Sequence, residues 1–390
     1  MKKLFYTGAI GLILFEISNV YFIMPMPGSQ ELDSISLAYF LYKWRWVIRM
    51  VLLAMVIVGI AAAFRGRSKW MAGILLLLAA GVAYLFNFRM TADKMFLQPE
   101  AVVMALKSQN KLPGDRLVIG VEKNNEAKAY PIEFLAYHHQ VRDSLGGQPI
   151  IVTYCSVCRT GRVFEPVVNG LPEQFRLVGM NHFNAMFEDA TTKSWWRQVN
   201  GEAVAGSLKG AQLPEVESRQ MTVEKWFELY PEGLVMQPDE AFIHTYDPHG
   251  NFEKGKSKGS LTRTDSLSWK AKSWVIGIAT GQSSKAYDWN ELVAKRVIND
   301  TIGEKFIVLA LASDGSSFAA FERPADKVFM INDRDDFLAD STVYDFAGRN
   351  LSAPANHLKP VQASQEFWHS WHTFHPETEQ YEPVSSDTEL

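Results

Sequence analysis

The chain has 390 residues, of which 47% are hydrophobic and 21% charged, and its formal net charge is −4. This composition excludes collagen-like, low-complexity and mainly disordered classes, and two cysteines in total exclude a disulfide framework. Residues 1–90 carry nine Lys/Arg and three Asp/Glu, a net charge of +6, whereas residues 91–390 carry 30 Lys/Arg and 40 Asp/Glu, a net charge of −10. The acidic part argues against nucleic acid as a partner.

Three apolar stretches in the basic part have the length of membrane spans. They are residues 4–24, 46–64 and 70–88. A span of about 20 residues at ~1.5 Å per residue crosses a hydrocarbon core of ~30 Å. The first stretch is too long for a signal peptide, and no small-residue cleavage site follows it. We therefore expect residues 1–90 to form a membrane anchor of three helices, with membrane lipid as a partner.

The basic residues around these stretches predict their orientation. Lys2 and Lys3 precede the first span, and Arg65, Arg67 and Lys69 lie between the second and third. Because short cytoplasmic loops are enriched in Lys and Arg, the third span is expected to lead outward. We expect the protein in the bacterial inner (cytoplasmic) membrane, with the rest of the chain facing the periplasm or cell exterior. Glu16, in the middle of the first span, is expected either to face the other helices or to be protonated.

The acidic part consists mainly of patterns typical of short strands. Residues 91–112 resemble a linker with a short helix, and residues 117–121 and 127–131 resemble two strands around a turn. Residues 132–139 have helical spacing, and residues 149–154 form a β-branched, buried type of strand. Residues 91–390 are therefore expected to form an α+β, strand-dominated extracytoplasmic domain.

This pattern occurs twice, 157 residues apart. Between residues 118–165 and residues 275–322, 13 of 48 positions are identical without gaps, including Val-Ile-Gly, Lys-Ala-Tyr, one Asp and one Gly. The number far exceeds chance and indicates an internal duplication, with halves at about 113–230 and 270–382. Residues common to both halves are expected to be architectural, and residues present in one half are candidates for function.

By that criterion the chemically capable side chains belong to the first half. It contains His138, His139, Cys155 and Cys158, where the second half has Lys295, Arg296, Ala312 and Gly315. A Cys-x-x-Cys sequence at the end of a strand suits three roles. It can bind a soft metal such as copper or zinc, form a thiol–disulfide exchange pair, or form a small structural disulfide.

Other residues could complete a soft-metal site. His139 shares a helix face with Ile132 and Leu135, and His182 lies near Met180 and Met186. Imidazole and thioether groups are ligands that copper accepts. The predicted metal ligands are therefore Cys155, Cys158, His139, His182 and Met180. Three further histidines, His369, His372 and His375, alternate with aromatic residues, and we expect that segment to be a packed helix rather than a metal site.

Asp189 starts a segment with two interpretations. It can orient a ligand or a catalytic histidine, or it can close a hairpin through an Asx-turn. A hydrolase with Cys155 or Cys158 as nucleophile, His139 as base and Asp143 or Asp189 as orienting group is also possible chemically. No oxyanion-hole, P-loop or dinucleotide motif accompanies these residues.

Several of these segments resemble the bacterial family known as domain of unknown function 3179. The resemblance covers about residues 95–382. It is carried by residues 127–131, Tyr-His-His with Asp143, residues 152–161, residues 187–198, and the aromatic segment 367–378. The resemblance implies a secreted or membrane-anchored protein, as most members of the family are, and it implies no particular activity. The three-span anchor of this chain is a departure from members that have a simple signal peptide. The resemblance places eight residues on recurrent motifs: His139, Asp143, Cys155, Cys158, Asn184, Asp189, Ser194 and Trp196.

The sequence thus supports three hypotheses of different classes. The first is a membrane-anchored extracytoplasmic protein that binds copper or zinc through Cys155, Cys158 and nearby histidines, supported by Asp143, Asn184, Asp189, Ser194 and Trp196. The second is thiol–disulfide exchange at the two cysteines. The third is a non-catalytic scaffold that binds envelope proteins.

Overall fold

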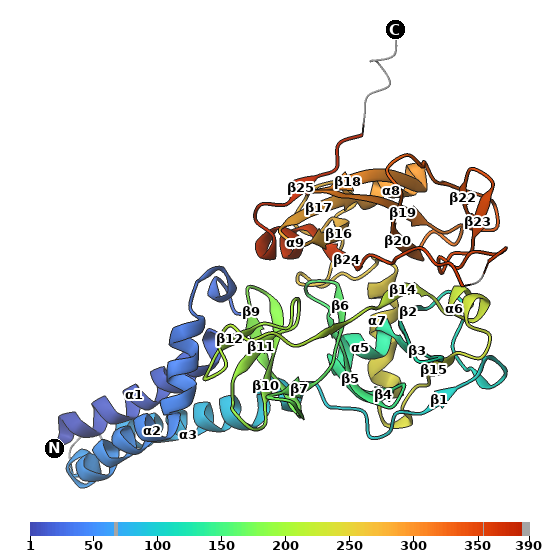
Figure 1. Cartoon of the computed structure of the whole chain (residues 1–390). Coiled ribbons are helices and arrows are strands. Elements are labelled where there is room, and N and C mark those ends of the chain that lie inside the picture. Colours follow the sequence, from blue (N-terminus) through green and yellow to red (C-terminus); the bar gives the residue numbers. More distant parts are fainter. Residues whose placement is uncertain (66–68, 354, 384–390) are drawn as a thin grey trace. The chain divides into compact units, whose positions relative to one another are not determined.

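The computed structural model describes residues 1–65, 69–353 and 355–383 (Figure 1). The chain divides into two compact units. The first comprises residues 1–97 and 168–212, and the second comprises residues 98–167 and 213–390. The architecture is α+β with a strand-rich second unit, as the sequence predicts.

The first unit begins with three long apolar helices (Figure 1). They are α1 (Lys2–Tyr21), α2 (Ile35–Phe64) and α3 (Lys69–Tyr84), the last continued by the π-helix η2 (Leu85–Arg89). All three are long and apolar enough to cross a membrane. Helix α2 starts well before the predicted span at residue 46. Its first turns do not need lipid, because Ala38, Tyr39 and Tyr42 pack on a sheet of the same unit.

A polar cluster holds the three helices together. The Arg49 guanidinium donates to both Glu16 carboxylate oxygens at 2.7 and 2.8 Å and to Asn87 Oδ1 at 2.6 Å. Asn87 Nδ2 in turn donates to Glu16 Oε2 at 2.8 Å. Glu16 is 2% exposed. The prediction that Glu16 faces the other helices is confirmed, and the ion pair removes an isolated charge from the bundle.

The rest of the first unit is mainly an antiparallel sheet in the order β12-β11-β10-β9. Its strands are β9 (Phe175–Asn181), β10 (Asn184–Asp189), β11 (Trp195–Arg197) and β12 (Ala203–Ala205). Short elements complete it: η1 (Ser29–Glu31), α4 (Ala92–Met95) and strand β8 (Leu171–Pro172), which pairs with β7 (Val167–Val168) at the boundary between the units. Buried Trp195 packs edge-to-face on Tyr39 of α2 at 5.1 Å, which fixes the sheet on that helix.

The second unit contains two similar halves. The first half comprises β1 (Met104–Ala105), η3 (Lys107–Gln109), β2 (Leu117–Lys123), β3 (Glu126–Pro131), α5 (Ile132–His138), β4 (Gln140–Leu145), β5 (Gln148–Cys155), β6 (Thr160–Phe164), β13 (Glu215–Val216), β14 (Arg219–Thr222), α6 (Val223–Leu229), β15 (Leu234–Met236), η4 (Glu240–Phe242) and α7 (Ile243–Glu253).

The second half repeats most of this order. It comprises β16 (Trp274–Thr280), β17 (Ser283–Asp288), α8 (Trp289–Lys295), β18 (Val297–Ile302), β19 (Lys305–Leu311), β20 (Phe318–Glu322), β21 (Met330–Ile331), β22 (Phe337–Ala339), β23 (Thr342–Tyr344), β24 (Ala363–Phe367), α9 (Trp368–Phe374) and β25 (Glu379–Gln380). The main sheets of the two halves are ordered β1-β15-β3-β2-β14 and β24-β16-β17-β25, beside the sheets β13-β6-β5-β4 and β18-β19-β20.

Residues shared by the halves build the same contacts twice. The Tyr130 hydroxyl donates to Asp143 at 2.8 Å, and the Tyr287 hydroxyl donates to Asp300 at 2.9 Å. The preceding lysines pair with the same carboxylates, at 3.2 Å in the first half and 3.0 Å in the second. Asp143 therefore has an architectural role that its repeat partner shares, which weakens its assignment to a functional site.

The duplication extends beyond the segment detectable by sequence identity. Helices α6 and α9 each follow a strand that pairs with the Val-Ile-Gly strand of their half. Trp226 of α6 packs on Gly120, and Trp371 of α9 packs on Gly277, where a Cβ atom would come within 2.4 and 2.1 Å of the ring. The glycines are therefore shared because the indole rings occupy the space of a side chain.

Candidate functional site

The two cysteines lie in the turn between β5 and β6, which we name the cysteine turn (residues 155–160). Cys155 ends β5 and pairs with Thr160 of β6, and Arg159 adopts a left-handed conformation with φ of 59°. Both cysteines are 0% exposed and are present as thiols rather than as a disulfide. Burial, followed by the hydrogen bond to Cys155, raises the pKa of the Cys158 thiol well above its usual value. The two sulfur atoms are therefore neighbours.

The second half supplies the opposite wall of this turn. Phe367 N, at the end of β24, donates to the Cys158 carbonyl at 2.9 Å. The Ser370 hydroxyl of α9 can donate its one proton to Glu366 Oε2, at 2.8 Å, or to the Cys158 sulfur, and donation to the sulfur opposes the rise in the thiol pKa. Cys158 thus lies between strand β6 of one half and helix α9 of the other.

A buried ion pair lies next to these groups. Arg162 of β6 approaches Glu366 of β24 at 3.1 Å, and Glu366 is 0% exposed. Burial raises the pKa of Glu366, although the Arg162 charge acts in the opposite direction. Because each partner comes from a different half, the pair ties the two halves together beside the cysteine turn.

A lysine and a histidine cover the same turn. The Lys272 ammonium donates to the carbonyls of Val157 and Leu261, both at 2.7 Å, and lies 3.0 Å from His369 Nε2. His369 Nε2 is also 3.2 Å from the Val157 carbonyl, so its tautomer decides which contact is a hydrogen bond. Burial lowers the pKa of Lys272 to about 8, and the two cysteines oppose that shift. Burial lowers the pKa of His369 to about 4.

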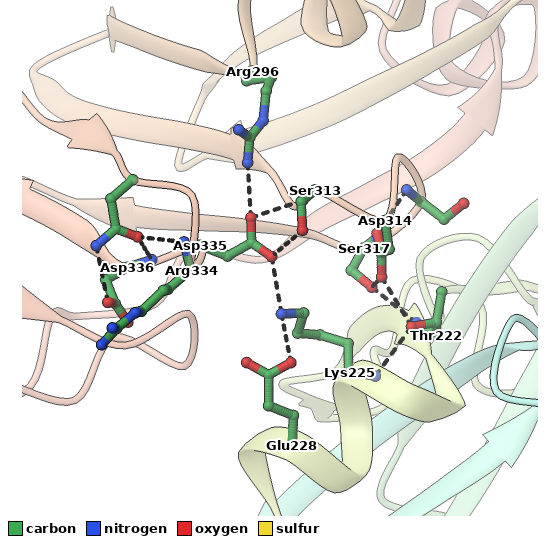
Figure 2. A network of polar contacts seen from close by, with 12 residues as sticks. Thr222, Lys225, Glu228, Arg296, Ser313, Asp314, Ser317, Arg334, Asp335 and Asp336 are labelled. Carbon is green, nitrogen blue, oxygen red and sulfur yellow. Dashed lines mark hydrogen bonds and ion pairs between the residues drawn. The ribbon is translucent and has the colours of Figure 1, made fainter.

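The equivalent turn of the second half has a different chemistry, shown in Figure 2. Asp335, from the segment between β21 and β22, packs against this turn, is 1% exposed, and binds Lys225 of α6 at 2.9 Å and Arg296 at 2.7 Å. Ser313 donates to Asp335 through its backbone N–H and its hydroxyl. Counted from the packed tryptophans, Lys225 occupies in α6 the position of Ser370 in α9. One turn therefore carries two thiols, and the other borders an ion network to which its Ser313 donates.

His139 ends helix α5 in a left-handed conformation, with φ of 60°. Its Nδ1 lies 2.9 Å from the Tyr154 carbonyl, which can only accept, so this contact fixes the tautomer in which Nε2 carries the lone pair. Burial lowers the pKa of His139 to about 4, and the ring is therefore neutral at physiological pH. A backbone carbonyl that orients a neutral imidazole in this way is common behind metal-binding histidines.

The other residues expected at the site belong to the first unit. His182 contacts the Gln30 carbonyl and Asp33, both at 3.1 Å. Met180 N donates to the Ile23 carbonyl at 2.7 Å. These two predicted ligands thus contact the segment between α1 and α2. They belong to the first unit, whereas the cysteine turn belongs to the second.

The four supporting residues of that unit build its sheet. Asp189 accepts hydrogen bonds from the backbone of Lys193 and Ser194 and from Trp196 Nε1, the last at 2.9 Å. This arrangement is the turn-closing alternative of the two interpretations for Asp189. Asn184 donates to Gln198 at 3.0 Å, and the Ser194 hydroxyl accepts from Leu208 N at 3.2 Å. Asn184, Asp189, Ser194 and Trp196 therefore have evident structural roles.

Three residues of the candidate site were not selected from the sequence as functional. They are Lys272, Ser370 and His369, the last of which was expected only to pack. Aligning residues 223–229 with residues 368–374 through their tryptophans would have marked His369 and Ser370 as differences between the halves. Within the described part of the chain, no three His, Cys, Asp or Glu side chains form a group that could hold a metal ion.

Comparison with known proteins adds a family but no activity. The family model described as Protein of unknown function (DUF3179) matches residues 98–378. This match confirms the resemblance seen in the sequence. Neither the search of curated proteins nor the search of solved structures gives a match.

Proposed function

We propose that the cysteine turn is a soft-metal site and that its metal is Cu(I). The chain that carries it belongs to the DUF3179 family of proteins of unknown function. The observation that carries the proposal is the pair of neighbouring, buried thiols in one of two equivalent turns. Thiolates are soft ligands that select Cu(I), whereas structural zinc takes four ligands. Because Cu(I) is stable with two thiolates, Cys155 and Cys158 suffice.

Charge balance supports the same metal. Cu(I) would replace the two thiol protons, and the resulting bis-thiolate complex would carry one negative charge. The Lys272 ammonium lies against the cysteine turn and would compensate that charge. Neither His139 nor His369 forms, among the described residues, a three-residue group with the two cysteines that could hold a metal ion, so either ring would have to move to add a nitrogen ligand.

The test is a Cu(I) competition titration of the detergent-purified full chain under reducing conditions, with a chromophoric chelator. We expect one equivalent of Cu(I) bound by the wild-type protein and loss of binding in Cys155→Ser and Cys158→Ser. Ser156→Ala, in the same turn, is the matched control and should bind normally. Weaker binding in His139→Ala or His369→Ala would identify a third ligand. Equal binding by the wild-type protein and the cysteine variants would reject the proposal.

Thiol–disulfide exchange is the second candidate, and the proximity of the two sulfur atoms favours it. The burial of both thiols and the raised pKa of Cys158 oppose it, because exchange needs an accessible thiolate. A reduction potential between about −120 and −270 mV, together with mixed disulfides on partner proteins, would favour this candidate. If the protein neither binds metal nor exchanges disulfides, the scaffold hypothesis would explain both negative results.

We also propose the location of the site. The three apolar helices support membrane anchoring, and the basic residues at the start of α1 and between α2 and α3 favour an outward-facing domain. The metal site would then lie in the periplasm or at the cell exterior of a bacterium.

A further inference from the structure

A cavity of about 580 Å³ lies in the first unit, between the start of helix α2 and the sheet β9–β12. Helix α2 contributes Tyr42, Lys43 and Arg45, and the sheet with its turns contributes Arg176, Glu188 and Lys193. The walls are fixed by direct contacts. The Tyr42 hydroxyl donates to Glu188 Oε1 at 3.1 Å and accepts from Arg176 at 2.7 Å.

The lining has an excess of positive charge. The lining contains four basic side chains and one carboxylate, that of Glu188. Arg176 is neutralised, because it pairs with Glu188 at 2.8 Å and with Asp93, outside the lining, at 3.3 Å. Lys43 and Lys193 are exposed, and no ion pair to either exists within residues 1–65, 69–353 and 355–383. Arg45 donates to the Tyr42 carbonyl at 2.6 Å and stacks on the Tyr42 ring, so its charge also lacks a carboxylate partner in those ranges.

An apolar groove in the same unit shares one lining residue with this cavity. Arg45 also lines a second cavity of about 730 Å³ between the three helices. Apart from the polar cluster Glu16–Arg49–Asn87, that groove is lined mainly by Ala, Leu, Val and aromatic side chains. Trp46, next to Arg45, is 65% exposed at the start of the predicted span. Tryptophans at this position mark the membrane surface, so the basic cavity lies at head-group level.

We propose that the basic cavity binds the phosphate-bearing head group of an anionic phospholipid, one acyl chain of which lies in the groove between the helices. Lys43, Arg45 and Lys193 attract the phosphate, and the apolar groove holds the chain. A soluble phosphate compound would satisfy the basic groups only. Because Arg45 lines both cavities, a ligand that carries both a phosphate and an acyl chain suits them better, which favours a lipid.

The test compares lipids bound by the full chain in neutral detergent, with native mass spectrometry as the readout. We expect one phosphatidylglycerol bound in preference to phosphatidylcholine, and no binding of glycerol phosphate or inorganic phosphate at the same concentration. The variant Lys43→Gln with Lys193→Gln should weaken phosphatidylglycerol binding, by about fivefold for each charge removed. Both side chains are exposed, so the fold should persist, which circular dichroism would check.

The matched control is Lys3→Gln with Lys69→Gln, which removes the same charge at the opposite end of the helices. This variant should bind phosphatidylglycerol as the wild-type protein does. Three results would overturn the proposal: no preference for the anionic lipid, equal binding of glycerol phosphate or inorganic phosphate, or an equal loss in both variant pairs. The second result would indicate a soluble phosphate site, and the third would indicate general attraction by the charged surface.

Discussion

At the scale of single residues, the cysteine turn is distinguished by what surrounds it rather than by the thiols alone. Its counterpart in the second half has Ala312 and Gly315 at the cysteine positions, and a charged network around Asp335. Both turns lie at a boundary between halves and both are packed by a helix of the other half. Ion pairs lie beside both turns, but only the cysteine turn also carries two polarizable sulfur atoms that a soft metal can use.

Glu253 is a second residue whose environment has a measurable consequence. It is 3% exposed, its Oε2 accepts from Leu117 N at 3.3 Å, and its Oε1 has no hydrogen-bond partner among the described residues. Burial, followed by repulsion from Glu133, raises its pKa from 4.5 to about 8. Between these two values the folded protein keeps a proton that the unfolded chain loses. Stability should therefore fall as pH rises through this window.

We accordingly predict that Glu253→Gln stabilises the protein in a pH-dependent way. At about pH 9 the variant should melt several degrees above the wild-type protein, because it avoids a buried carboxylate. At about pH 5 the difference should be much smaller, because the wild-type carboxyl is then largely protonated in the folded state. Thermal melting of the full chain in detergent measures both. Glu224→Gln, at an exposed position of α6, is the control, and an equal gain at both pH values would contradict the prediction.

At the scale of elements, the second helix of each half packs against the β-turn region of the other half. Helix α9 covers the cysteine turn, and helix α6 carries Lys225 to Asp335. The side chains of Gln220 and Gln365, which precede these helices at equivalent places, bond to each other at 3.0 Å. This reciprocal packing explains why the two halves form a single compact unit and not one unit each.

The packed tryptophans give a prediction for this arrangement. Gly120→Ala and Gly277→Ala should each destabilise the protein by about 1–3 kcal/mol, because the added methyl would overlap the ring of Trp226 or Trp371. Gly73→Ala in α3, where a Cβ atom meets nothing within 4 Å, should have little effect. The measurement is the melting temperature of each of the three variants, compared with that of the wild-type protein. Losses no larger than that of Gly73→Ala would show that the rings can move away.

At the scale of the whole molecule, the apolar helices and the two-half unit raise the question of membrane orientation. We predict that alkaline phosphatase fused to the C-terminal end is active and that green fluorescent protein fused there is dark, because positive residues favour the cytoplasmic side. The same reporters fused after Arg65 should give the reverse result. Active phosphatase after Arg65, with fluorescence at the C-terminal end, would invert the proposed orientation.

The sequence by itself determined the features that depend on local pattern: the three apolar spans, the α+β class, the duplication and the two cysteines that occur in one half. Span length, side-chain alternation and residue identity are all readable along the chain. The surroundings of the cysteine turn are not, because His369 contacts Val157 across 212 positions. Only the tertiary structure decided that Lys272 and α9 cover the turn, and that His182 and Met180 belong to the other unit. Contacts between distant segments follow from how sheets and helices pack, and neither composition nor periodicity encodes that packing at single positions.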